Sequence, residues 1–183
     1  MRRAARLIRR FARDTRAAIS VEALLVTPVL VWVFLAMFVY WEAFRAQNTH
    51  VKATDAIADM ISRENTGINA SYVDGMHTIF RFISDTPLDT ALRVTNVQYR
   101  ESDDTYLVLW SRSSNTGRAP VHTTATLAQH RDRMPIMADS DTLLVIETWR
   151  DFQPYFQVGL GNHTFYEFFV VRPRFLSPIP FYS

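Results

Sequence analysis

The chain of 183 residues contains no cysteine, so disulfides, thiolate metal sites and a cysteine nucleophile are excluded. The same absence fits export to an oxidising compartment. Positive charge is scarce beyond the N-terminus: the first 16 residues hold seven of the 20 basic residues and one of the 18 acidic residues, which leaves 13 basic and 17 acidic side chains. A nucleic-acid-binding protein spreads basic residues over a folded face, so we expect no nucleic-acid partner.

Charge is also missing from residues 23–41, a run of 19 residues interrupted only by Thr27 and Pro28. A helix of this length covers about 28 Å, close to the ~30 Å hydrocarbon core of a bilayer. Tyr40 and Trp41 end the run, and aromatic rings of this kind prefer the membrane interface. The pattern predicts one transmembrane helix rather than a buried core helix.

The seven arginines before this run predict its orientation, because basic residues beside a span stay in the cytoplasm. Residues 42–183 would then lie outside. A cleaved secretory signal has an apolar core of about 7–15 residues followed by a small-x-small site, and residues 42–46 lack that pattern. The pair Arg9-Arg10 resembles a twin-arginine signal, but scattered arginines form such pairs by chance. We therefore expect a retained anchor.

Glu22 lies one position before the uncharged run, where a carboxylate is unfavourable unless it lies among headgroups or has a partner. Residues 16–28, RAAISVEALLVTP, resemble the N-terminus of TadE/TadG-like proteins, which are pseudopilins of the tight-adherence (Tad or Flp) pilus system. The family pattern is a basic leader, a glycine, four small or apolar residues, a glutamate, an aliphatic run and a proline. The resemblance covers roughly residues 14–45.

The resemblance implies that a prepilin peptidase cuts between Ala17 and Ala18, leaving Glu22 as the fifth residue of the mature chain. Ala17 stands where the family usually has glycine, so an uncleaved form is the alternative. Glu22 would pair with the new amine of Ala18 on a neighbouring subunit and fix the stagger of the helices. Pro28 would mark a helix kink. Implied partners are the inner membrane, other Tad pilus subunits and assembly-platform proteins, in a homo- or hetero-oligomer.

We expect four segments. They are a basic cytoplasmic leader (1–17), a transmembrane helix (18–41), a helix extension outside the membrane (42–66) and a periplasmic α+β domain with a proline- and aromatic-rich tail (67–183). No proline or glycine interrupts 42–64, so the helix is expected to continue well beyond the bilayer. The part outside the membrane must then pack on its own domain, which we prefer, or on a neighbour's helix. Gly67 is expected to cap the helix C-terminus.

The outer domain is predicted to contain a helix over 72–84 and an antiparallel sheet, in a pilin-like arrangement with the long helix. Strands are expected over 92–100, 105–111, 142–149 and 164–171, with 101–104 as a hairpin turn. Residues 122–133 weakly favour helix. The tail, 172–182, has three prolines, which favour a strap packed along the domain; a docking segment is the alternative.

No motif for catalysis or metal binding is evident. His122 and His130 are eight residues apart without a carboxylate to complete a site on one helix, and residues 139–141 are typical of a polar turn. We therefore expect no catalytic, cofactor or metal residues. The preferred function is a pilin-like subunit of a Tad-type pilus and secretion machine. An unprocessed single-pass envelope scaffold and a membrane-anchored periplasmic enzyme are the alternatives.

Overall fold

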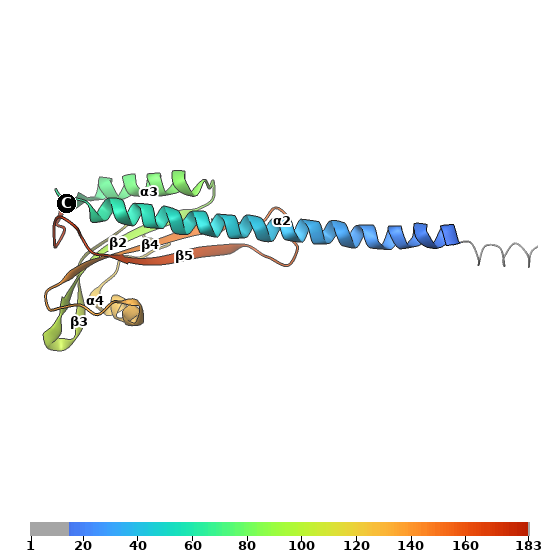
Figure 1. Ribbon diagram of the computed structural model, residues 1–183. Coiled ribbons are helices and arrows are strands. Elements are labelled where there is room, and N and C mark those ends of the chain that lie inside the picture. Colours follow the sequence, from blue (N-terminus) through green and yellow to red (C-terminus); the bar gives the residue numbers. More distant parts are fainter. Residues whose placement is uncertain (1–14, 183) are drawn as a thin grey trace, which may run out of the picture. The chain divides into compact units, whose positions relative to one another are not determined.

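The computed structural model describes residues 15–182, with side chains from residue 21 onward (Figure 1). Most of the expected basic leader, residues 1–14, lies outside the described residues. The chain is α+β, with one long apolar N-terminal helix and a four-stranded antiparallel sheet. It divides into two compact units. The first contains the described residues up to Glu42 together with Pro154–Gly161, and the second contains Ala43–Gln153 and the described residues from Asn162 onward.

Helix α2, Thr15–Ser62, confirms the predicted long helix, and its helical backbone continues through Pro28. It ends at Ser62, four residues before the expected boundary at 66. Gly67 takes the expected left-handed conformation, with φ of +97°, but it lies five residues beyond the helix and is not its cap. A Cβ there would lie 3.1 Å from the carbonyl oxygen of Pro180, so glycine is required where the C-terminal tail approaches the backbone.

All four predicted strands are present, as β2 (Thr90–Arg100), β3 (Thr105–Ser113), β4 (Thr142–Phe152) and β5 (His163–Val171). They form one antiparallel sheet in the order β3-β2-β4-β5. The hairpin turn between β2 and β3 is the short 3-10 helix η1 (Glu101–Asp103), followed by Asp104 at φ 53°. The expected turn at 101–104 is therefore confirmed.

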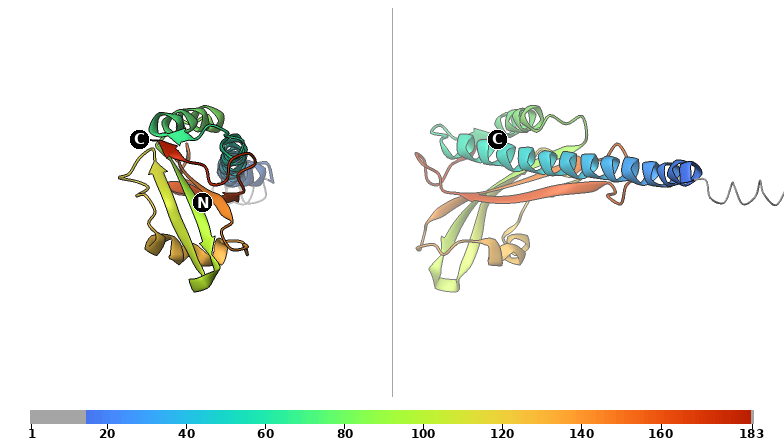
Figure 2. Two further views of the ribbon diagram at one scale, coloured as in Figure 1. Left: turned by 90° about the vertical axis from the view of Figure 1, so that its left-hand side faces the viewer. Right: turned by 45° about the vertical axis from the view of Figure 1, so that its right-hand side comes forward.

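One face of the sheet is covered by the C-terminal part of α2 and by helix α3, Ala70–Ser84 (Figure 2). Ala53, Ile57 and Ile61 of α2 are fully buried in this core. Polar contacts join the same helix to β4: the hydroxyls of Thr54 and Thr148 lie 2.6 Å apart. The extension thus packs on its own domain, as preferred. Burial of the side chains of Ile57 and Ile61 contributes about 1.5–3 kcal/mol each.

Helix α3 begins two residues before the predicted boundary because Asn69 caps it: the Asn69 side chain accepts a hydrogen bond from the backbone N–H of Tyr72 at 2.9 Å. The opposite face of the sheet is covered by α4 (Thr124–Leu127) and the 3-10 helix η2 (Ala128–Arg133). The weak helical preference of residues 122–133 is therefore confirmed as two short turns. Leu127 and its neighbours form the second apolar cluster with Val97, Leu143 and Val145.

The C-terminal tail is the predicted strap. Its last two described residues form β6 (Phe181–Tyr182), which pairs in parallel with β1 (Ile68–Asn69). The carbonyl oxygen of Ile179 accepts hydrogen bonds from Asn96 Nδ2 at 2.9 Å and Trp110 Nε1 at 2.7 Å. The Ile179 side chain is 1% exposed and belongs to the core between helices and sheet. The tail therefore completes the core.

We expect Ile179→Ala to lower the free energy of unfolding of the full-length protein in detergent by about 2–5 kcal/mol, because it opens a cavity in a closed core. Phe175→Ala is the matched control, since that side chain lies in the same tail but is 71% exposed. Denaturant titration followed by circular dichroism measures both. Equal losses for the two variants would contradict the structural role of Ile179.

Candidate functional site

The residues that the resemblance assigns to processing and assembly all lie on the first part of α2. Ala17 and Ala18 are in its first turns, and Pro28 is inside it. Glu22 is exposed and forms no hydrogen bond or ion pair with another described residue. The kink at Pro28 and the cleavage after Ala17 stay predictions.

The same part of α2 presents an apolar surface that the rest of the described residues leave almost uncovered. Among the described residues, this is one helix long and apolar enough to cross a membrane, a property that a signal sequence shares. The exposed large side chains between residues 21 and 38 are Val21, Leu24, Leu25, Val26, Val29, Leu30, Val31, Trp32, Val33, Phe34, Met37 and Phe38.

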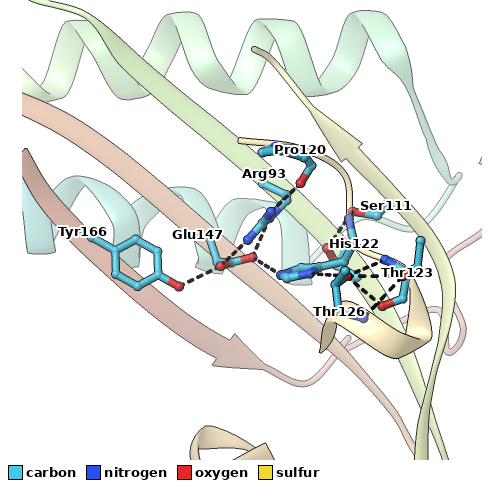
Figure 3. Close-up of polar contacts among 9 residues, drawn as sticks. Arg93, Ser111, Pro120, His122, Thr123, Thr126, Glu147 and Tyr166 are labelled. Atoms are coloured by element: carbon cyan, nitrogen blue, oxygen red, sulfur yellow. Dashed lines mark hydrogen bonds and ion pairs between the residues drawn. The ribbon is translucent and has the colours of Figure 1, made fainter. Parts of the chain in front are cut away.

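A second cluster, which we call the Glu147 network, lies on the sheet face that carries α4 (Figure 3). Glu147 is fully buried and sits directly opposite Arg93 in the register of β2 and β4. Arg93 donates from Nε to Glu147 Oε2 at 2.7 Å and from Nη2 to Oε1 at 2.6 Å. Tyr166 of β5 donates its hydroxyl to Oε1 at 2.7 Å. The Nε2 of His122 lies 2.9 Å from Oε2.

Local structure fixes the direction of each side chain in the Glu147 network. His122 lies just before α4, where its backbone N–H donates to Ser111 Oγ at 2.9 Å and its Nδ1 lies 3.1 Å from Thr126 Oγ1. Thr126 also belongs to the capping box that starts α4. Arg93 donates from Nη1 to the carbonyl oxygen of Pro120. The loop before α4 is thereby tied to β2 and β3.

Electrostatics keep this carboxylate ionised. Burial by itself raises the pKa of Glu147, but hydrogen bonds from His122 and Arg93, with the charge of Arg93, outweigh it and lower the pKa from 4.5 to about 2. Burial and the hydrogen bond to Glu147 raise the pKa of Tyr166 above its ordinary value. A carboxylate with so low a pKa is a weak base near neutral pH. The geometry therefore favours a permanent ion pair over general-base chemistry.

The structure also brings together three groups that can hold a metal ion. One ligand atom each from His122, His130 and Glu147 lies within 4.8 Å of the others. Two imidazoles and a carboxylate suit zinc and similar ions. Both oxygens of Glu147, however, already accept from the guanidinium of Arg93. A divalent ion would have to displace that cation and remain beside its charge. The donor set fits the ion-paired network better than a metal.

Sequence reasoning considered His122 and His130 but missed Arg93, Glu147 and Tyr166. Glu147 lies on strand β4, and no pattern within a single helix connects it to the two histidines. A usable signal was present: Arg93 and Glu147 are opposite charges flanked by apolar or β-branched residues in the interiors of two predicted strands. Asp139 and Asp141 lie in the polar turn that the sequence predicted, where the side chain of Asp139 accepts a hydrogen bond from the backbone N–H of Glu101 at 2.8 Å.

No family model matches this chain, and neither a curated protein nor a solved structure matches it. The fold and the two clusters define a class of protein: an α+β chain whose described residues include one helix long and apolar enough to cross a membrane and a sheet domain that contains a buried ion pair. The likeness of residues 14–45 to TadE/TadG-like proteins remains a prediction.

We expect Glu147→Gln to lower the free energy of unfolding by about 3–5 kcal/mol, because it leaves the buried Arg93 guanidinium without a counter-charge. Glu167→Gln is the matched control, since Glu167 lies on the neighbouring strand and forms no hydrogen bond or ion pair with a described residue. Adding Arg93→Met to Glu147→Gln should restore part of the loss. Equal losses at positions 147 and 167 would exclude a buried ion pair.

The lowered pKa of Glu147 also predicts a pH dependence. A carboxyl group whose pKa falls on folding stabilises the protein above its unfolded pKa and loses that contribution as the pH drops toward the folded value. Between pH 4.5 and about pH 2, the unfolding free energy of the wild type should therefore fall more steeply than that of Glu147→Gln. Denaturant titrations at several pH values measure the two slopes. Parallel curves would refute the assignment.

Proposed function

We propose that this protein is a pilin-like subunit, a pseudopilin or minor pilin, of a Tad-type pilus assembly and secretion machine. In this proposal residues 18–41 anchor it in the bacterial inner membrane, with the N-terminus cytoplasmic and the sheet domain periplasmic. One observation carries the proposal: helix α2 is exposed and apolar near its N-terminus, whereas Ala53, Ile57 and Ile61 of its later part are buried in the core against the sheet.

The length of α2 supports this division of roles. Its 48 residues extend about 72 Å at 1.5 Å per residue, more than twice the ~30 Å of a hydrocarbon core. The N-terminal part therefore spans the bilayer while the C-terminal part serves as a structural helix of the folded domain. In this proposal one helix serves both as the membrane anchor and as part of the folded domain. We infer that the protein acts by assembly rather than by catalysis.

Glu22 supports assembly between subunits. It is exposed at the start of the apolar surface and has no partner among the described residues. A carboxylate at a membrane boundary is stabilised when a cation meets it, and a paired charge specifies the arrangement of helices. In the proposed mechanism the cation is the amine of Ala18 on a neighbouring subunit, exposed when the prepilin peptidase cuts after Ala17.

A second candidate function follows from Ala17 itself. Because alanine replaces the usual glycine before the cut, the chain is also suited to be an unprocessed single-pass scaffold of the envelope. The scaffold keeps the same anchor and the same folded domain, but it lacks the Ala18 amine. The two functions therefore differ in the N-terminus of the mature protein.

We expect the protein isolated from its native membrane to begin at Ala18, and to keep Met1 in a strain without the prepilin peptidase. Intact mass and N-terminal peptide sequencing measure this. Ala17→Gly should increase the cleaved fraction, because it restores the residue usual at this position. An intact leader in every strain would reject the pilin-like function in favour of the scaffold.

The same membranes provide the control for assembly. Glu22→Ala should leave the cleavage unchanged and reduce crosslinking between subunits through single cysteines placed in the span, which the cysteine-free chain permits. Asp55→Asn is the matched control, because Asp55 is an exposed carboxylate on the same helix within the second compact unit. Equal crosslinking in the two variants would show that Glu22 takes no part in the contact between subunits.

A further inference from the structure

The loop between β4 and β5 differs from the other exposed loops in composition and position. Residues 152–166 contain no Asp, Glu, Lys or Arg. Pro154–Gly161 of this loop belongs to the same compact unit as α2 up to Glu42. Tyr155 is 76% exposed and Phe156 is 44% exposed, whereas Val158 is buried. The loop therefore presents two aromatic rings outward while it packs through an aliphatic residue.

The loop lies beside the outer end of the proposed span. A Cβ at Gly159 would be 3.9 Å from the hydroxyl of Tyr40, and Gly159 has a positive φ of 104°, which favours glycine. Tyr40 and Trp41 are the last residues of the uncharged run, and both are exposed. Aromatic residues at the ends of a span lie at the level of the lipid headgroups. The loop shares that level with Tyr40.

We propose that Pro154–Gly161 is a second membrane contact, which inserts Tyr155 and Phe156 into the outer headgroup layer beside Tyr40. This proposal rests on the proposed transmembrane span. Lipid is the occupant favoured by the chemistry: the loop combines aromatic rings with uncharged amides, from Gln153 and Gln157, a mixture suited to the interface. The exposed rings also continue the apolar surface of α2 within one compact unit.

A second contact changes how the protein is held. A single helix can rotate about its axis and slide along the bilayer normal. A loop that enters the headgroups on one side of the helix opposes both motions. It would thereby determine which face of α2 meets a neighbouring subunit. It would also determine the depth in the membrane at which Glu22 meets that subunit.

Site-specific labelling tests the proposal, because the chain has no native cysteine. Tyr155→Cys carries an environment-sensitive fluorophore in the full-length protein, reconstituted at low density in phosphatidylcholine–phosphatidylglycerol vesicles. Leu30→Cys, on the apolar surface of α2, is the control for the span. Ile136→Cys is the matched control for an exposed apolar position, since Ile136 is 98% exposed in the second compact unit. All three substitutions replace exposed side chains, so the fold should tolerate them.

We expect the label at position 155 to be quenched by lipids brominated near the headgroup, and to be several-fold less quenched by aqueous iodide than the label at 136. If positions 155 and 136 behave alike while position 30 is quenched by lipid, the loop proposal is wrong and the span stands. If position 30 is also open to iodide, the anchor and the proposed function fail together. Protection from iodide at 155 without lipid quenching would replace the lipid contact by a second copy of the chain.

Discussion

The constraint on which the rest of the structure depends is the continuity of one 48-residue helix. No glycine or second proline interrupts the sequence of α2 after Pro28, and the helix contributes residues to both compact units. The apolar side chains of each part therefore need surroundings that shield them from water. In its later part, the aliphatic side chains of Ala53, Ile57 and Ile61 are buried against the sheet, and Thr54 forms a hydrogen bond with Thr148 of β4. In the first part, the apolar surface is satisfied by lipid and neighbouring helices in the function we propose.

The other face of the sheet is organised by a different interaction, the ion pair of Arg93 and Glu147. Since Glu147 is fully buried, its charge is stable only because guanidinium, phenol and imidazole groups all reach the same two oxygens. The partners come from β2, β5 and the loop before α4. One carboxylate thus links two neighbouring strands and the loop before α4. A buried pair of this kind specifies an arrangement better than it stabilises one.

The elements were predictable because their signals are local: the helical patterns of residues 42–64 and 72–84 and the β-branched strands all lie within short windows. The exact boundaries of the helices were less predictable. Asn69 starts α3 through a side-chain cap, and the left-handed Gly67 serves the tail rather than the helix. The Glu147 network could not be assembled from sequence, because β2 and β4 are neighbours only in space and their register decides that Arg93 faces Glu147. The sequence indicates only that opposite charges lie in the interiors of two predicted strands.

Two carboxylates in this chain occupy unfavourable surroundings, and they are satisfied differently. Glu147 lies in a core, and the chain itself supplies every donor that it needs. Glu22 adjoins a long apolar surface, and no described residue pairs with it. The same physical requirement, a cation or a donor for a poorly solvated carboxylate, applies to both. Where the chain meets that requirement internally, the result is a rigid domain. For Glu22 no described residue meets it, and in the function we propose a neighbouring subunit supplies the cation, which is why we assign the assembly contact to Glu22 rather than to Glu147.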